Sequence, residues 1–261
     1  MAKTYEAMMK AEEEAQKKQV DRGPSTVGRG PSSIDRGQSL DEYYRLKLNI
    51  LRSSQNGKIK SLLFLSPTGR EGATTVLVEF AMALAGQGEK VLLIDANFRS
   101  PSLHQRFHLE MEKGLTDLLL QRSTLKDVIK GSGVDNLFVI TSGAVDRGSS
   151  FSDRGPSTVD RGLSSSGRGL FPFNGLDSHI ARMEEQADWV LFDGPPVNHL
   201  DEGLALSGKV DGVVMVLQAE KTRWEVAQAA KQRLEDSGGK ILGVVLNKRK
   251  FYIPKWIYKT L

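Results

Sequence analysis

The sequence contains no cysteine, so it offers neither disulfide bonds nor thiolate metal sites. It also lacks any apolar run near the roughly 20 residues that a membrane-spanning helix needs. Residues 10–18 near its start are rich in lysine and glutamate, unlike the apolar core of a secretory leader. A dispersed net charge of +4 gives little support to nucleic acid as a partner. We therefore expect a cytoplasmic, soluble protein whose partners do not include nucleic acid.

The most informative segment is the glycine-bearing stretch SPTGREGATT at residues 66–75. An apolar run of strand length precedes it, and apolar residues at helical spacing follow from Ala73 to Gly88. The first N–H groups of a helix have no intrahelical partners, and the peptide dipoles place partial positive charge there, so phosphate binds at such a turn. The regular motif adds a lysine for the phosphates and a hydroxyl for magnesium. Thr74 supplies the hydroxyl, but position 73 carries alanine. Taken alone, the segment also fits an ordinary strand-to-helix turn.

Two further apolar runs end in an acid. Residues 90–94 lead into Asp95 and, four residues later, Arg99, whereas residues 189–192 lead into Asp193. Ligands of open parallel sheets gather at the carboxyl ends of the strands, where Asp95 can orient or activate a water molecule. Magnesium prefers oxygen ligands and keeps several waters, so one nearby carboxylate is enough to hold it. Each acid alone also fits a strand-terminating cap.

At this point the chain resembles the cytoplasmic domains of bacterial tyrosine autokinases and related ATPases of capsule and exopolysaccharide assembly, within the MinD/ParA class of P-loop proteins. The loop and the two acidic strands recur there in this order, over roughly residues 37–145 and 170–250. The resemblance implies ATP or ADP with Mg²⁺ as cofactors. It implies Asp95, Asp193 and Arg99 as catalytic residues, and Thr74 with Asp193 as metal ligands. The implied nucleotide-binding residues are Gly69, Arg70, Glu71, Gly72, Ala73, Thr74, Thr75 and the adenine-contacting Asn247.

The resemblance also implies partners. A membrane chain-length or export protein of polysaccharide assembly would bind this domain at the inner membrane, and the domain would form a homo-oligomer. The basic and aromatic tail suits an anionic membrane surface or an acidic groove of a partner, although an ordinary solvated tail is the alternative. Tyr252 and Tyr258 in this tail are the candidate phosphoacceptors.

The departures from the family pattern predict an impaired enzyme. Ala73 replaces the phosphate-loop lysine, and Asn97 replaces a second acid. A further segment resembles the helix through which kinase protomers pack together. Asp41, Tyr44 and Lys47 stand there in place of a Glu and two Arg. Because lysine lacks the planar guanidinium of arginine, it cannot form the bidentate pairs with carboxylates that such packing would use. We expect a nucleotide-binding protein with weak phosphotransfer. Two alternatives are an active autokinase or ATPase that uses a substitute cation, such as Arg70, Arg99 or a partner residue, and a scaffold that binds no nucleotide.

The domain organisation follows from composition. Residues 1–36 form an opening helix and a low-complexity linker, and residues 37–250 form the P-loop domain. A heptapeptide close to DRGPSTV recurs in the linker and again over residues 146–169, which we interpret as a flexible insertion because its composition cannot bury a core. Residues 251–261 form the basic, aromatic tail.

Strands and helices alternate along the domain. Further strands are predicted at residues 136–140, 212–217 and 241–246, and helices at residues 175–187, 201–208 and 222–237. This alternation predicts an α/β fold, a mainly parallel sheet with helices on both faces.

Overall fold

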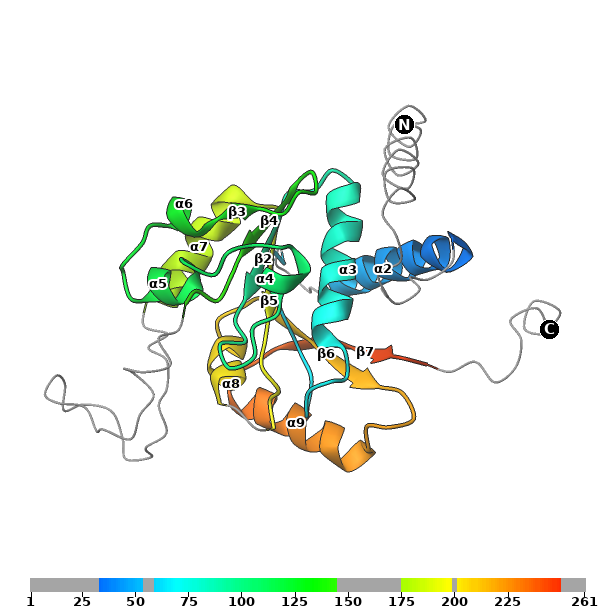
Figure 1. Cartoon of the computed structure of the whole chain (residues 1–261). Coiled ribbons are helices and arrows are strands. Elements are labelled where there is room, and N and C mark those ends of the chain that lie inside the picture. The colour runs from blue at the N-terminus through cyan, green and yellow to red at the C-terminus, as the bar shows by residue number, and fades with distance from the viewer. Residues whose placement is uncertain (1–32, 54–58, 145–174, 199–200, 250–261) are drawn as a thin grey trace, which may run out of the picture. The chain divides into compact units, whose positions relative to one another are not determined.

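The computed structural model describes residues 33–53, 59–144, 175–198 and 201–249 (Figure 1). Contacts divide the chain into two units, Met1–Ser39 and Leu40–Leu261. Most of the predicted linker, the heptapeptide insertion at residues 146–169, and the tail with Tyr252 and Tyr258 lie outside the described residues. Nearly all of the predicted P-loop domain lies in the second unit.

A seven-stranded sheet forms the centre of the second unit, in the order β3-β4-β2-β5-β1-β6-β7. The strands are β1 (Ser61–Leu65), β2 (Val91–Asp95), β3 (Lys130–Gly131), β4 (Leu137–Ile140), β5 (Trp189–Asp193), β6 (Gly212–Gln218) and β7 (Ile241–Asn247). Every pairing is parallel except the one between β3 and β4. The prediction of a mainly parallel sheet is confirmed, while the short antiparallel β3 was not predicted.

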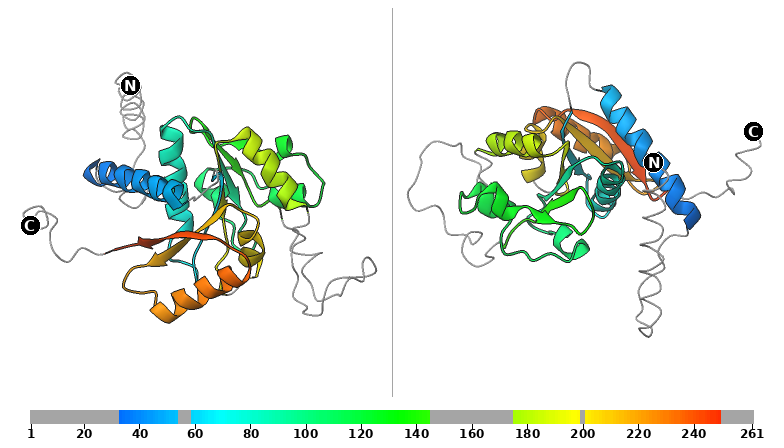
Figure 2. Two further views of the ribbon diagram at one scale, coloured as in Figure 1. Left: turned by 180° about the vertical axis from the view of Figure 1, so that it is seen from behind. Right: turned by 90° about the horizontal axis from the view of Figure 1, so that it is seen from above.

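Helices cover both faces of this sheet, as predicted (Figure 2). They are α2 (Ser33–Ser53), α3 (Ala73–Gly86), α4 (Leu103–Arg106), α5 (Leu115–Leu119), α6 (Leu125–Val128), α7 (Leu176–Gln186), α8 (Glu202–Ser207) and α9 (Trp224–Asp236). The short helices α5 and α6 were not predicted. No described helix combines the length and apolar character needed to cross a membrane.

The central strands explain why the sequence reads as continuous apolar runs. In β2, Val91 and Leu93 belong to the buried cluster that includes residues of α2 and α3, whereas Leu92 and Ile94 belong to the cluster on the other face, which includes residues of α5, α7 and α9. Both sets of side chains are buried, which is the usual condition of a parallel sheet with helices on each face. The strand ends are therefore held rigidly, and their polar residues are fixed in place.

Candidate functional site: the loop between β1 and α3

The predicted phosphate loop connects β1 to α3 at the carboxyl edge of the sheet. Gly69, Arg70 and Gly72 have φ angles of 89°, 61° and 96°. Successive turns of this kind form concave backbone surfaces whose N–H groups can face an anion. Gly72 is the N-cap of α3 and has no side-chain cap. Its glycine is required, because a side chain there would be strained and would meet the amide nitrogen of Asn247.

Glu71 braces the loop from within. Its side chain is buried, and its carboxylate accepts hydrogen bonds from the N–H of Gly69 at 2.8 Å and the hydroxyl of Thr68 at 2.8 Å. The hydroxyl of Thr222, from the segment between β6 and α9, donates to the same carboxylate at 3.5 Å. Glu71 therefore orders the loop and ties it to a neighbouring strand end. We predicted Glu71 as a nucleotide-binding residue, but its internal bonding was not foreseen.

Thr74 and Asp193 lie in direct contact. Thr74 Oγ1 donates to the two carboxylate oxygens of Asp193 at 3.0 and 2.8 Å. Asp193 ends β5, which pairs with β1, and this pairing brings the carboxylate to the start of α3. Burial and, next in size, the charge of the neighbouring Asp95 raise the pKa of Asp193 to about 8, against the opposing effects of the Thr74 hydroxyl and the charge of Arg106. Hydroxyl and carboxylate oxygens are the donor set that Mg²⁺ prefers, so this pair fits the predicted ion.

Asp95 has a different environment. It is fully buried, and its carboxylate accepts hydrogen bonds from the N–H groups of Asn97 at 3.2 Å, Ser102 at 2.9 Å and Leu103 at 3.0 Å. Burial raises its pKa, and these three bonds act in the opposite direction. This is the geometry of a cap that holds the turn between β2 and α4.

Of the other predicted site residues, Asn247, Ala73 and Thr75 lie at the loop, whereas Arg99 bonds elsewhere. Asn247, at the end of β7, donates from its amide to the carbonyl of Glu71 at 2.9 Å. Ala73 opens α3 and is buried, and Thr75 follows in the same turn. Arg99 instead pairs with Glu202 at 3.3 Å, and its side chain is 62% exposed. Among the described residues, Arg99 therefore bonds to α8 and not to the loop.

Two cations at the loop were missed. Arg106 Nη2 donates to Thr75 Oγ1 at 2.8 Å, and Lys248 Nζ donates to the carbonyl of Arg70 at 2.7 Å. Lys248 had one signal, its place directly after a residue predicted to contact adenine. Arg106 had none, because nothing in the neighbouring sequence indicates that its side chain reaches the loop.

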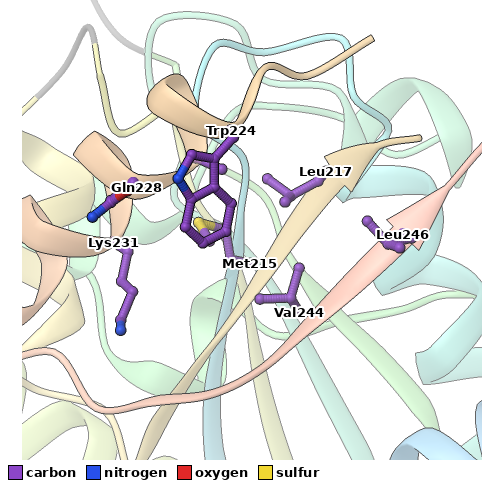
Figure 3. Close-up of a pocket in the computed structure, with 8 residues that line it drawn as sticks. Met215, Leu217, Trp224, Gln228, Lys231, Val244 and Leu246 are labelled. Atoms are coloured by element: carbon purple, nitrogen blue, oxygen red, sulfur yellow. The ribbon is translucent and has the colours of Figure 1, made fainter. Parts of the chain in front are cut away.

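Two hollows border these elements. One, of about 410 Å³, lies between the loop and the segment after β6, with Arg70, Lys221 and Arg223 in its lining. The other, of about 420 Å³, is almost wholly apolar and lies between α9 and the strands β6 and β7. Figure 3 shows the indole of Trp224 beside Met215 and Leu217, with Val244 and Leu246 on the neighbouring strand. Among the described residues, no group of three or more His, Asp or Glu side chains is arranged to hold a metal.

A mainly parallel sheet with this loop after β1, one of its inner strands, is typical of a P-loop fold, and comparisons with known proteins agree. A family model described as an AAA domain matches residues 62–231. The tyrosine-protein kinase YwqD of Bacillus subtilis is 31% identical over 210 residues, covering 80% of this chain and 81% of the relative. The chain therefore belongs to the bacterial tyrosine-protein kinase family that carries this AAA domain.

Solved structures support the same fold. The kinase domain of the Escherichia coli tyrosine kinase ETK matches with a TM-score of 0.71 and 20% identity, covering 90% of this chain and 86% of that one. The septum site-determining protein MinD from Pyrococcus horikoshii, complexed with Mg-ADP, matches with a TM-score of 0.56 and 19% identity, covering 77% and 76%. At these identities the likeness concerns the fold, and it confirms the predicted MinD-like architecture.

Proposed function

We propose that this protein binds ATP or ADP with Mg²⁺ at the loop between β1 and α3. The observation that carries the proposal is the contact of Thr74 with Asp193 at the start of a helix that no side chain caps. A hydroxyl and a carboxylate beside exposed helical N–H groups combine the partners of a metal ion with those of a phosphate.

The residues divide into three groups. Residues 70–75 would hold the phosphates through their backbone N–H groups, Gly69 would shape the turn through its bond to Glu71, and Asn247 would contact the adenine. Thr74 and Asp193 would hold the metal, which supplies positive charge against the phosphate oxygens when bound. The bonds of Asp95 favour a positioning role over that of a base, and the pairing of Arg99 with Glu202 gives the proposed catalytic role of Arg99 no geometric support.

We propose weak phosphotransfer for the same site because Ala73 brings no charge to the loop. Losing a charged hydrogen bond to a phosphate costs about 1.5 to 3 kcal/mol of binding. The loss is larger in a transition state, since phosphoryl transfer depends on stabilising charge that develops on oxygen. Nucleotide would therefore still bind, while its turnover would be slow.

The cellular role that we propose is bacterial exopolysaccharide or capsule biosynthesis or export. The resemblance to capsule autokinases supports it, together with membership of the tyrosine-protein kinase family. The domain would act from the cytoplasm, at the inner membrane, on a membrane chain-length or export protein. Homo-oligomerisation, and Tyr252 and Tyr258 as phosphoacceptors, remain predictions.

The active autokinase or ATPase is the second candidate, because Arg106 and Lys248 bring positive charge to the loop that the sequence did not reveal. A scaffold that binds no nucleotide is the third. Calorimetric titration of the purified full chain with Mg-ADP separates the scaffold from the other two. Detection of phosphotyrosine after incubation with Mg-ATP then separates an active kinase from a protein that only binds.

The variant Ala73→Lys tests the role of position 73. Restoring the lysine is expected to lower the dissociation constant for Mg-ADP by about tenfold or more, the equivalent of one charged hydrogen bond. An unchanged constant would show that position 73 does not face the phosphates. The control is Met82→Lys, because Met82 is an exposed residue further along the same helix, and a lysine there should leave the constant unchanged.

A further inference from the structure

The guanidinium of Arg106 lies at the first turn of α3. Arg106 is the last residue of α4, and its Nη2 donates to Thr75 Oγ1 at 2.8 Å. Thr75 is the third residue of α3, two positions after Ala73. A positive group from another element therefore reaches the helix end at which the lysine of the regular motif would begin.

Arg106 is held in this place by the buried part of the fold. The N–H groups of Ser102 and Leu103, at the start of α4, donate to Asp95, and Leu103 is fully buried among the residues under α3. Helix α4 is thereby fixed at its first residue, only three positions before Arg106. The arginine is presented by an anchored turn.

The guanidinium of Arg106 has donors beyond the one that bonds to α3. The bond to Thr75 uses one of the five N–H donors of a guanidinium. The remaining N–H donors lie in one plane, an arrangement suited to bidentate contact with phosphate oxygens.

Two other cations near the site are differently placed. Arg99 pairs with Glu202, and Lys248 contacts the carbonyl of Arg70, on the preceding part of the loop. Of these three side chains, Arg106 is the one bonded to the first turn of α3.

We propose that Arg106 is the phosphate-binding residue that replaces the missing loop lysine, contacting the phosphate chain of a nucleoside diphosphate from α4. This inference rests on the proposed nucleotide-binding function. It turns the alternative of a substitute cation into a named residue.

The test is calorimetric titration of the full chain with Mg-ADP. Arg106→Gln is expected to weaken binding about tenfold or more, because it removes a charged donor. Arg106→Lys retains charge without the fork and should fall between Gln and the wild type. Arg182→Ala, an exposed arginine on α7 across the sheet, is the control and should stay within about twofold of the wild type.

A double-variant cycle separates replacement of the lysine from a general effect of charge. In the Ala73→Lys background, Arg106→Gln should weaken binding by a clearly smaller factor than in the wild type, because the restored lysine does the same task. Equal factors in the two backgrounds would overturn the replacement. Thermal unfolding without nucleotide identifies misfolded variants. If Arg106→Gln is misfolded, the affinity of Arg106→Lys decides the assignment, since this variant keeps a long side chain.

The titrations distinguish the role of Arg106 from nucleotide binding itself. If the wild type binds Mg-ADP and both Arg106 variants bind equally well, the assignment of Arg106 is wrong and nucleotide binding stands. If the wild type does not bind Mg-ADP, the proposed function fails and the assignment fails with it.

Discussion

Asp95 and Asp193 end neighbouring strands and lie opposite each other in the register of β2 and β5, yet their surroundings differ. Three backbone N–H groups bond to the carboxylate of Asp95, whereas the carboxylate of Asp193 accepts a hydrogen bond from the hydroxyl of Thr74. Both are buried, and burial raises both pKa values. One carboxylate is committed to holding a turn, and the other keeps acceptor capacity for a ligand.

This comparison shows that two acids with the same pattern in the sequence can serve different purposes. An apolar strand followed by an acid predicts a carboxylate at the sheet edge, but the following loop decides what it binds. After β2 the chain turns back into α4 and presents N–H groups to Asp95. After β5 it continues as Gly194 and two prolines, and proline has no N–H to donate.

The largest expected effect is on the stability of the β2 end. Asp95→Ala leaves buried N–H groups without an acceptor and should lower the free energy of unfolding by about 3 kcal/mol or more. Asp95→Asn keeps one acceptor oxygen and should cost less. Urea unfolding measures both, and a loss below about 1 kcal/mol for the Ala variant would contradict the capping role.

The next effect concerns Asp193 and depends on pH. The folded pKa of about 8 lies above the reference value of 3.8, so the folded state retains a proton that the unfolded state loses as pH rises between these values. This contribution to stability is present at low pH and is lost as pH rises towards 8. Asp193→Asn removes the ionisation and should raise the free energy of unfolding at pH 9 by about 2 kcal/mol.

Near pH 4, where Asp193 is neutral in the folded protein, Asp193→Asn should change the free energy of unfolding little. Urea unfolding in the presence of a metal chelator, at pH 9 and at pH 4, tests both expectations. Asp193→Asn should also weaken magnesium-dependent nucleotide binding, and a variant that binds Mg-ADP as tightly as the wild type would refute the metal assignment.

The smallest effect belongs to the contact between Thr74 and Asp193. The hydroxyl acts to lower the pKa of Asp193, so Thr74→Val should raise that pKa and reduce stability at pH 9 by about 1 kcal/mol, with a smaller loss at pH 5. Thr116→Val is the control, because Thr116 donates to a carbonyl, that of Ser142, which does not titrate. Thr116→Val should lower the free energy of unfolding by the same amount at pH 5 and at pH 9. If Thr74→Val showed no pH dependence either, the hydroxyl would not contribute to the ionisation of Asp193.

The sequence predicted the parts of the fold that depend on local pattern. The strands β1, β2 and β5 are buried on both faces, so they appear as uninterrupted apolar runs, and α3 is apolar along most of its length between two glycines. The short elements α5, α6 and β3 have between two and five residues, too few for a period to emerge.

The candidate site was predictable to the same extent. Thr74 and Asp193 meet because parallel strands bring their carboxyl ends to one edge, and that rule can be applied to a sequence. The contacts of Arg106 and Thr222 cannot be read that way, because they depend on where unpredicted turns place them. Arg99 was expected at the loop, but the acid at Glu202, distant in sequence, holds its side chain.

The end of β7 has a consequence for the order of the loop. Asn247 and Lys248 bond to the carbonyls of Glu71 and Arg70, and β7 is the last strand of the sheet, paired along one side by β6. Fraying of this edge strand would break both of these hydrogen bonds to the loop at once. Amide hydrogen exchange in β7 and in the loop should then rise and fall together, as in one cooperative unit of local opening.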